Sequence, residues 1–392
     1  MAEKRSKSNK KFMLLSAIGI FMVVDHHTFT AFNLLGDYIP YNSFFMPMFV
    51  FVSGYFNKVD SSTNLIKYLW KKIRGLLIPY IGISVLVFLL EQLIDMIKLG
   101  EAPEIPSWFL SYSLPRIITV GSFAPIATPM WFVIALFATL TVYAVFKKIL
   151  YKIWNSYIML VLFLGLSIFA VAVAKYAVYT PYLLVPLKVI FFLPFLEMGI
   201  IYRERLEKFH SRMSAGAKIA LMFGLLIFNA IRTMYLPMPY DIAFDSIDEM
   251  AGFTSPFLIT PLISSLVGIT FWLTLVDMIN KPFAGSRFVN YMSCNTFWIM
   301  GLHIVFFNIF NLILLLIREN LIYLPCFDTD YFRESEWYYW EISPNIKILY
   351  VAVGILGPLG IKLICDKISG LVSRRFLAVY HNRVSQHKTG LK

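Results

Sequence analysis

The feature that most constrains this chain is a series of long apolar stretches that recur along nearly its whole length. Each has roughly 18 residues or more, and a helix of that length crosses the hydrocarbon core of a bilayer. Hydrophobic residues make up 58% of the 392 residues and charged residues only 15%, whereas soluble domains carry about 25% charged residues. The sequence therefore predicts an all-α, polytopic transmembrane helix bundle.

We expect ten membrane spans in a single domain that covers residues 1–392. The domain would consist of a basic N-terminus (1–11), a transmembrane bundle (12–366) and a basic tail (367–392). The predicted spans are 12–32, 41–57, 76–96, 129–147, 156–177, 183–202, 217–236, 257–279, 293–317 and 345–366.

The charge of the loops predicts the orientation of these spans. Loops such as "KKILYK" and "YRERLEKFHSR" are basic and alternate with neutral or acidic loops such as "YDIAFDSIDEM". Lys and Arg accumulate on the cytoplasmic side of a membrane protein, so both termini are expected to be cytoplasmic, in the inner (cytoplasmic) cell membrane. Because the net charge of +12 is spread over alternate loops and does not form one patch, nucleic acid is not an expected partner. Membrane lipids are expected partners.

The stretch "FMVVDHHTFT" (21–30) places Asp25, His26 and His27 within an otherwise apolar run. Ionisable groups at such depth are costly, and they usually face the bundle interior or a water-filled cavity. A neutral imidazole within reach of a hydroxyl can act as a general base. These three residues are therefore the candidate catalytic group, and the alternative is a histidine that only packs against a neighbouring helix.

Four further motifs follow in order: "SFFMPMFVFVSGYF" (43–56), "LWKKIRGLLIPY" (69–80), "PMWFVIALF" (129–137) and "NYMSCNTFWIMGLHIVFF" (290–307). With them the chain resembles acyltransferase family 3 over nearly its whole length, most strongly the fucose-acetylase-like branch and the surface polysaccharide O-acetyltransferases. The resemblance implies a membrane O-acyltransferase that uses cytoplasmic acyl-CoA, in particular acetyl-CoA, as donor substrate. The acceptor would be a hydroxyl of a glycan or lipid-linked glycan at the outer face. No permanently bound cofactor and no metal are expected.

The resemblance also assigns roles to particular residues. The catalytic first-span histidine of the family corresponds to His26 or His27. The basic motif before the third span corresponds to Lys71, Lys72 and Arg74, which could hold the phosphates of acyl-CoA by charge. The alternative for these three is an anchor to anionic lipid. They lie in residues 62–75, which are expected to form an amphipathic helix on the inner surface.

Five more residues are candidates for binding substrate or orienting it. Trp131 and Phe132 correspond to the family motif that opens the fourth span, and His303 to its histidine in a late span. Arg116 and Glu197 are charged residues close to or within predicted spans.

The chain departs from the family pattern at two places. The family usually carries Arg or Lys eleven positions before the first-span histidine, where this chain has Leu15 or Ser16, and the nearest basic residue is Lys11. A histidine that often precedes Met-Pro in the second span is replaced by Phe45. The choice between His26 and His27 as the catalytic residue therefore stays open. The sequence also leaves open whether the acyl group is transferred directly or through an acyl-enzyme, and what the oligomeric state is.

A second class of function also fits the intramembrane histidines. In a transporter or flippase for glycans or glycolipids they would relay protons. Binding of CoA distinguishes the two classes, because a flippase has no need of it.

Overall fold

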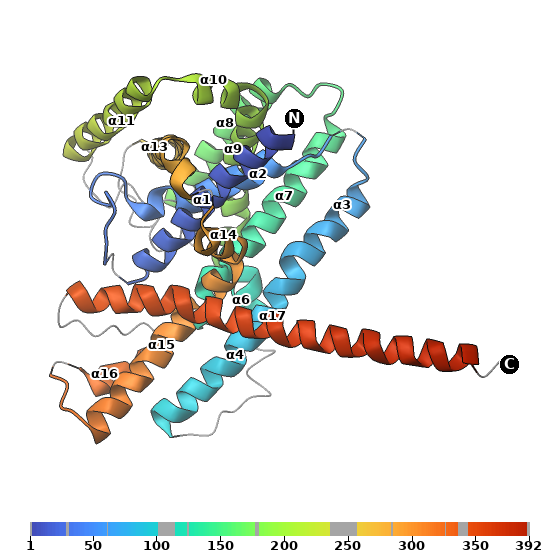
Figure 1. Cartoon of the computed structure of the whole chain (residues 1–392). Helices are drawn as coiled ribbons and strands as arrows, with labels where there is room; N and C mark the ends of the chain where they lie inside the picture. Colours follow the sequence, from blue (N-terminus) through green and yellow to red (C-terminus); the bar gives the residue numbers. More distant parts are fainter. Residues whose placement is uncertain are drawn as a thin grey trace.

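The computed structural model describes residues 2–28, 31–60, 62–100, 114–123, 125–176, 180–235, 257–283, 285–325, 327–335 and 344–389. Over these residues the chain is all-helical, as predicted (Figure 1). Its main helices are α1 (Ala2–His26), α2 (Phe45–Phe56), α3 (Leu65–Lys72), α4 (Ile78–Leu99), α7 (Trp131–Ile149), α8 (Ser156–Tyr176), α9 (Leu184–Ile201), α10 (Glu207–Arg212), α11 (Ala215–Tyr235), α13 (Thr260–Phe283), α15 (Thr296–Asn320) and α17 (Pro344–Thr389). Shorter helices are α6 (Leu114–Thr119), α14 (Arg287–Cys294) and α16 (Thr329–Glu334).

Eight helices among the described residues are long and apolar enough to cross a membrane, and a multi-pass membrane protein is thereby confirmed. The predicted second span forms α2, which is apolar but only 12 residues long. The first predicted span forms most of α1, which is not among the eight. The count of ten spans and the cytoplasmic termini stay predictions.

The first span is shorter than the predicted 12–32, because α1 ends at His26. The carboxylate of Asp25 accepts hydrogen bonds from the backbone N–H groups of Phe32 (3.0 Å) and Asn33 (3.2 Å). These bonds hold the following loop against the helix end, where Asn33 and Leu35 have positive φ angles. His26 and His27 therefore lie at the end of the helix and not within it.

Two long helices contain π-turns, which hold one residue more than an α-helical turn. The π-turn η2 (Ile73–Leu77) joins α3 to α4, so that residues 65–99 form one continuous helix. The predicted surface helix at 62–75 is therefore continuous with the apolar helix that follows it. The second π-turn, η6 (Tyr202–Leu206), joins α9 to α10 in the same way.

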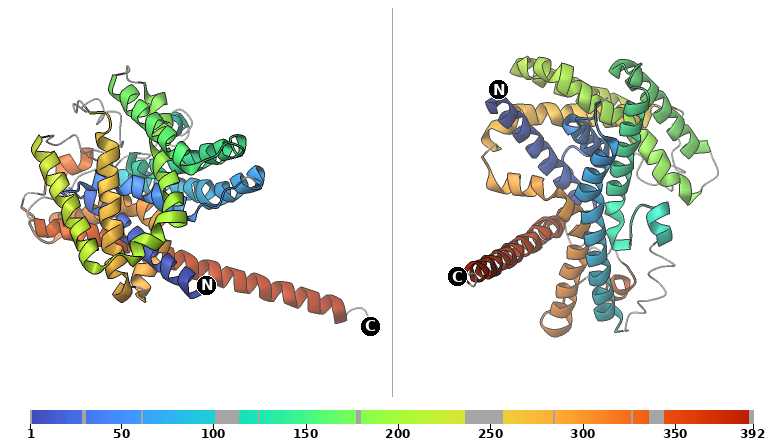
Figure 2. Two further views of the ribbon diagram at one scale, coloured as in Figure 1. Left: turned by 90° about the horizontal axis from the view of Figure 1, so that it is seen from above. Right: turned by 90° about the vertical axis from the view of Figure 1, so that its right-hand side faces the viewer.

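The helix α9 lies at the centre of the bundle, where it packs against α2, α7 and α8 (Figure 2). Two glycines allow the backbones of α2 and α9 to touch. A Cβ atom on Gly54 would lie 2.1 Å from the carbonyl oxygen of Leu196, and one on Gly199 would lie 2.1 Å from that of Phe51. Small residues commonly allow such close helix packing in membranes. The helices α4, α17 and α1 all pack on α15.

Candidate functional site

The end of α1 meets the middle of α15 through two histidines. His303 Nε2 lies 3.2 Å from His27 Nδ1, and the ring centroids are 4.9 Å apart. His303 is fully buried, whereas His27 is partly exposed. The structure thus brings together two of the predicted site residues from opposite ends of the chain.

The surrounding hydrogen bonds determine where these rings carry their protons. His303 Nδ1 lies 2.9 Å from the carbonyl oxygen of Ile299, and His27 Nδ1 lies 2.7 Å from that of Val23. A carbonyl only accepts, so in the neutral rings both Nδ1 atoms carry the hydrogen. His303 Nε2 is then an acceptor that faces the Nδ1–H of His27. In this tautomer the lone pair of His27 is on Nε2, which is the nitrogen able to take up a proton.

His26 lies beside this pair and not within it. Its ring centroid is 5.6 Å from that of His27 and 5.7 Å from that of Phe45. Phe45 is the residue that replaces a histidine of the family pattern, so an aromatic ring takes that place in the cluster. The structure therefore distinguishes the two adjacent histidines, because His27 alone contacts His303.

Asp25 is fully buried, and its carboxylate is directed to the loop that follows α1. The hydroxyl of Tyr41 holds the same loop. The same hydroxyl accepts a hydrogen bond from the N–H of Leu34. Asp25 thus anchors the loop that follows the two histidines at the end of α1.

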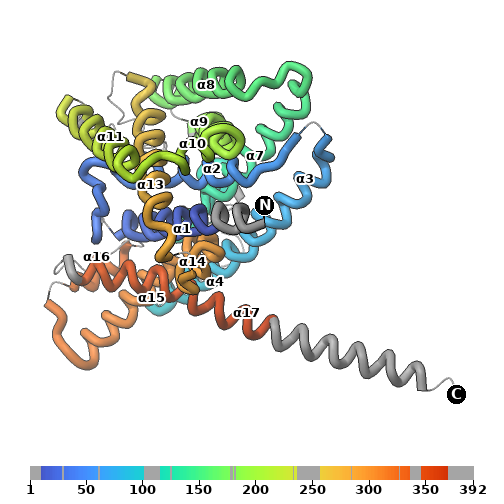
Figure 3. The backbone as a smooth tube through the Cα atoms, turned by 45° about the horizontal axis from the view of Figure 1, so that its top comes forward, coloured from blue at the N-terminus to red at the C-terminus, as the bar shows by residue number. Residues whose placement is uncertain are grey.

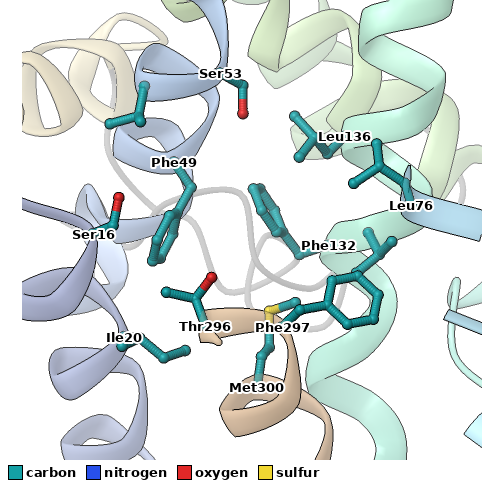
Figure 4. A pocket seen from close by; sticks show the side chains of 12 residues that line it. Ser16, Ile20, Phe49, Ser53, Leu76, Phe132, Leu136, Thr296, Phe297 and Met300 are labelled. Carbon is teal, nitrogen blue, oxygen red and sulfur yellow. The ribbon is translucent and has the colours of Figure 1, made fainter. Parts of the chain in front are cut away.

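A cavity of about 220 Å³ lies between α1, α2, η2, α7 and α15 (Figure 4). It is lined by Ser16, Ile20, Phe49, Val52, Ser53, Leu76, Phe132, Val133, Leu136, Thr296, Phe297 and Met300. The wall is mainly apolar, and its polar groups are three hydroxyls from three different helices. We call it the central cavity.

The directions of the helices give the central cavity two different ends. Toward the start of α1 it is bounded by Ser16, Ser53 and Thr296, and toward the histidines by Ile20 and Met300. Figure 4 shows Ser53 at one end and Ile20 and Met300 at the other. The cavity wall is therefore more polar at the end far from the histidines.

The central cavity is aligned with the histidine pair along both α1 and α15. Ile20 and His27 are seven residues apart, which is about two helical turns on one face, and Met300 and His303 are separated by about one turn. Phe49 and Phe132 both line the cavity, and their ring centroids are 6.0 Å apart. This aromatic pair lies on the cavity side of the histidines.

The predicted basic cluster lies beside the same cavity. Lys71 and Arg74 are exposed and Lys72 is partly buried. Lys72 lies over the ring of Tyr68 (5.3 Å) and Arg74 over that of Trp70 (5.5 Å). Leu76, which lines the cavity, follows Arg74 by two residues, so the charged groups lie on the helix that forms one wall of the cavity.

The other predicted residues are spread more widely. Phe132 lines the central cavity. The ammonium group of buried Lys188 lies 3.4 Å from the ring centroid of Trp131, as a cation–π contact. Arg116 donates to Thr128 Oγ1 at 3.1 Å.

Glu197 is fully buried and lies away from the histidines. Its carboxylate accepts a hydrogen bond from the hydroxyl of Tyr143 at 2.5 Å, which links α9 to α7. Neither Glu197 nor Arg116 lines the central cavity. Among the described residues, no group of three or more His, Cys, Asp and Glu side chains could hold a metal ion.

The two positions that depart from the family pattern have distinct surroundings. Ser16 lines the central cavity, so a hydroxyl stands where an eleven-residue spacing from His27 would place a basic side chain. Lys11 is buried elsewhere, between Glu207 (3.5 Å), Asp277 (3.3 Å) and the hydroxyl of Tyr202 (3.0 Å). Lys11 therefore does not replace the missing charge at the cavity.

Sequence comparison adds one finding. The acyltransferase-domain model of acyltransferase family 3 matches residues 12–365. No curated protein and no solved structure matches the chain.

Proposed function

The chain belongs to acyltransferase family 3, and we propose that its donor is cytoplasmic acyl-CoA, in particular acetyl-CoA. The acceptor is a hydroxyl of a glycan or lipid-linked glycan at the outer face of the cell membrane. The coarser statement, a membrane acyltransferase, follows from the family and from the apolar helices. The observation that supports the finer proposal is the His27–His303 pair, which lies on the same two helices as the cavity-lining residues Ile20 and Met300, farther along each helix.

In this proposal His27 is the general base. Its Nε2 takes the proton from the acceptor hydroxyl while that oxygen bonds to the thioester carbonyl carbon. The carbon–sulfur bond then breaks, CoA leaves as the thiolate, and the proton on Nε2 passes to the sulfur. Ester and free CoA are the products, and His27 returns to its neutral form.

His303 acts through His27 as a positioning residue. When Nε2 of His27 gains a proton, its Nδ1–H still points to the Val23 carbonyl and to His303 Nε2. Both are acceptors, so they stabilise the imidazolium that forms during the reaction. Such an orienting partner is what a catalytic imidazole generally requires.

The central cavity would receive the thioester end of the donor. Its volume of about 220 Å³ exceeds the roughly 150 Å³ that suffice for a benzene molecule. The hydroxyls of Ser16, Ser53 and Thr296 face the polar part of the pantetheine arm, and Lys71 and Arg74 contact the phosphates of CoA.

The test uses purified protein in liposomes with radiolabelled acetyl-CoA and a glycan acceptor. Wild type is compared with His27→Ala and His26→Ala. We expect CoA release and label transfer that depend on His27. A protein that neither binds nor consumes acyl-CoA would contradict the proposal and favour a glycan or glycolipid flippase.

A further inference from the structure

A second cavity, of about 360 Å³, is lined by residues of α2, α8, α9, η6, α10, α11 and α13. Figure 3 shows the course of these helices. This second cavity shares no residue with the central cavity. Its lining is Phe51, Leu160, Met198, Ile201, Tyr202, Leu206, Phe209, His210, Met213, Leu221, Leu266, Ile269, Thr270, Leu273 and Thr274. We call it the lateral cavity. Most of its wall is aliphatic or aromatic, so the few polar groups decide what could bind there.

These polar groups form one hydrogen-bonded chain within the protein. Lys11 donates to the hydroxyl of Tyr202 (3.0 Å), which in turn lies 2.8 Å from His210 Nδ1. His210 Nε2 lies 3.2 Å from the hydroxyl of Thr274, and that hydroxyl donates to the carbonyl of Thr270 (2.7 Å).

Only one set of hydrogen positions satisfies this chain. The Lys11 ammonium and the Thr270 carbonyl fix its two ends, since the first only donates and the second only accepts. Tyr202 therefore donates to His210 Nδ1, and His210 donates from Nε2 to Thr274. The polar groups of the wall are thus already paired with protein groups. A polar ligand would have to break these bonds, which favours a hydrocarbon as occupant.

The rim of the lateral cavity is basic. Arg205, Lys208 and Arg212 are exposed and alternate in sequence with lining residues of η6 and α10. The acidic residues of the same segment are already paired, Glu204 with Arg203 (3.0 Å) and Glu207 with Lys11 (3.5 Å). Three exposed cations consequently lie in the segment that forms part of the wall of an apolar cavity at one end of α9.

From this combination we propose that the lateral cavity binds one hydrocarbon chain of an anionic phospholipid, whose phosphate contacts Lys208 and Arg212. The volume fits a chain of roughly a dozen carbons, since about 150 Å³ holds a six-carbon ring. Charge at the rim and hydrocarbon in the cavity together match a lipid of the leaflet at which α9 ends. On the predicted topology that leaflet is the cytoplasmic one, opposite to the acceptor side.

This site is independent of the proposed acyl transfer, because its residues are neither the histidine pair nor the central cavity. It differs from ordinary lipid contact in being a recess that extends to Phe51, Tyr202 and His210, which are buried or nearly so. A lipid held there should survive extraction, whereas lipid on the outer helix faces should not.

The test measures lipid retention by native mass spectrometry. The full chain is exchanged into detergent with equal amounts of phosphatidylglycerol and phosphatidylcholine. Leu221→Trp fills the cavity, and Phe223→Trp is its control, because Phe223 lies on the same helix, is 62% exposed and does not line the cavity. Should Leu221→Trp not fold, Leu266→Phe fills the cavity from α13.

We expect wild type and Phe223→Trp to retain one phosphatidylglycerol, and Leu221→Trp to retain it at least about tenfold less. The double variant Lys208→Ser, Arg212→Ser should lose the preference for phosphatidylglycerol, whereas Lys281→Ser, Arg287→Ser should keep it. Equal retention in Leu221→Trp and Phe223→Trp would overturn the site. Retention of free fatty acid, or of both phospholipids equally by wild type, would overturn the assignment to an anionic phospholipid.

Discussion

His303 Nε2 lies 3.2 Å from His27 Nδ1, although 276 positions separate the two residues in the chain. The contact distinguishes His27 from its neighbour His26, whose ring contacts Phe45 instead. In the proposed mechanism the two residues are the general base and the partner that orients it.

Removal of the base should abolish transfer. His27→Ala is expected to lower kcat by about 10²- to 10⁴-fold, the usual contribution of a general base. His26→Ala, the control, should lower kcat by less than about tenfold, because His26 lies outside the pair. Steady-state CoA release measures both. The reverse order of effects would assign the base to His26.

His303 should affect the chemical step and not the binding of donor. We expect His303→Ala to lower kcat by about a hundredfold with an unchanged KM for acyl-CoA, because one of the two acceptors for the Nδ1–H of His27 is lost and only the Val23 carbonyl remains. The pH dependence of kcat should also move, since the partner affects how readily His27 takes up a proton. An unchanged pH profile with a raised KM would indicate a residue that only packs.

The carboxylate of Asp25 should be replaceable by an amide if it only anchors the loop. Asp25→Asn keeps one acceptor oxygen, which can serve one of the N–H groups of Phe32 and Asn33, whereas Asp25→Ala leaves both N–H groups without an acceptor. We expect Asp25→Ala to lower the free energy of unfolding by about 1–3 kcal/mol and Asp25→Asn by less. Thermal unfolding in detergent measures this. A stable Asp25→Asn protein without activity would make the carboxylate catalytic.

The crossing of α2 and α9 should not tolerate a side chain at Gly54. A Cβ there would meet the carbonyl oxygen of Leu196, so Gly54→Ala is expected to destabilise the protein by about 1–3 kcal/mol. Gly224→Ala is the matched control, because no atom lies within 4 Å of the added carbon. It should leave the Tm unchanged or raise it slightly. Similar Tm values for the two variants would contradict the close crossing.

The basic cluster should bind the donor by charge. Lys71→Glu combined with Arg74→Glu is expected to raise the KM for acyl-CoA at least about tenfold, and added salt should reduce the difference from wild type. Lys281→Glu combined with Arg287→Glu changes the total charge equally at exposed positions elsewhere. An equal rise of KM in both double variants would point to a general effect of charge.

The helical fold was predictable because a lipid-embedded backbone must satisfy its hydrogen bonds within helices. The end of α1 was not, because the apolar pattern continues past His26. What ends the helix is the carboxylate of Asp25, which bonds backbone groups seven and eight residues farther along the chain. Such a contact leaves no periodic signal.

The candidate site was predictable in part. Asp25, His26, His27 and His303 are conspicuous as ionisable residues in apolar surroundings. Which of the adjacent residues His26 and His27 pairs with His303 depends on how α1 and α15 pack. A single sequence does not reveal that packing. Lining residues such as Phe49 and Leu136 have the same composition as lipid-facing positions, so the central cavity has no signature in the sequence.

Both cavities are bounded by a π-turn. Leu76 of η2 lines the central cavity, and Tyr202 and Leu206 of η6 line the lateral one. The extra residue in each turn rotates everything before it by about 100° around the helix axis relative to everything after it. Deleting a single apolar residue there would leave hydropathy and total charge almost unchanged. It would nevertheless rotate the basic side chains about the helix axis relative to the residues of the same helix that line the cavity. The rotation that each π-turn introduces, and not only the composition of the two helices, therefore determines how the basic residues are oriented relative to the cavity in this bundle.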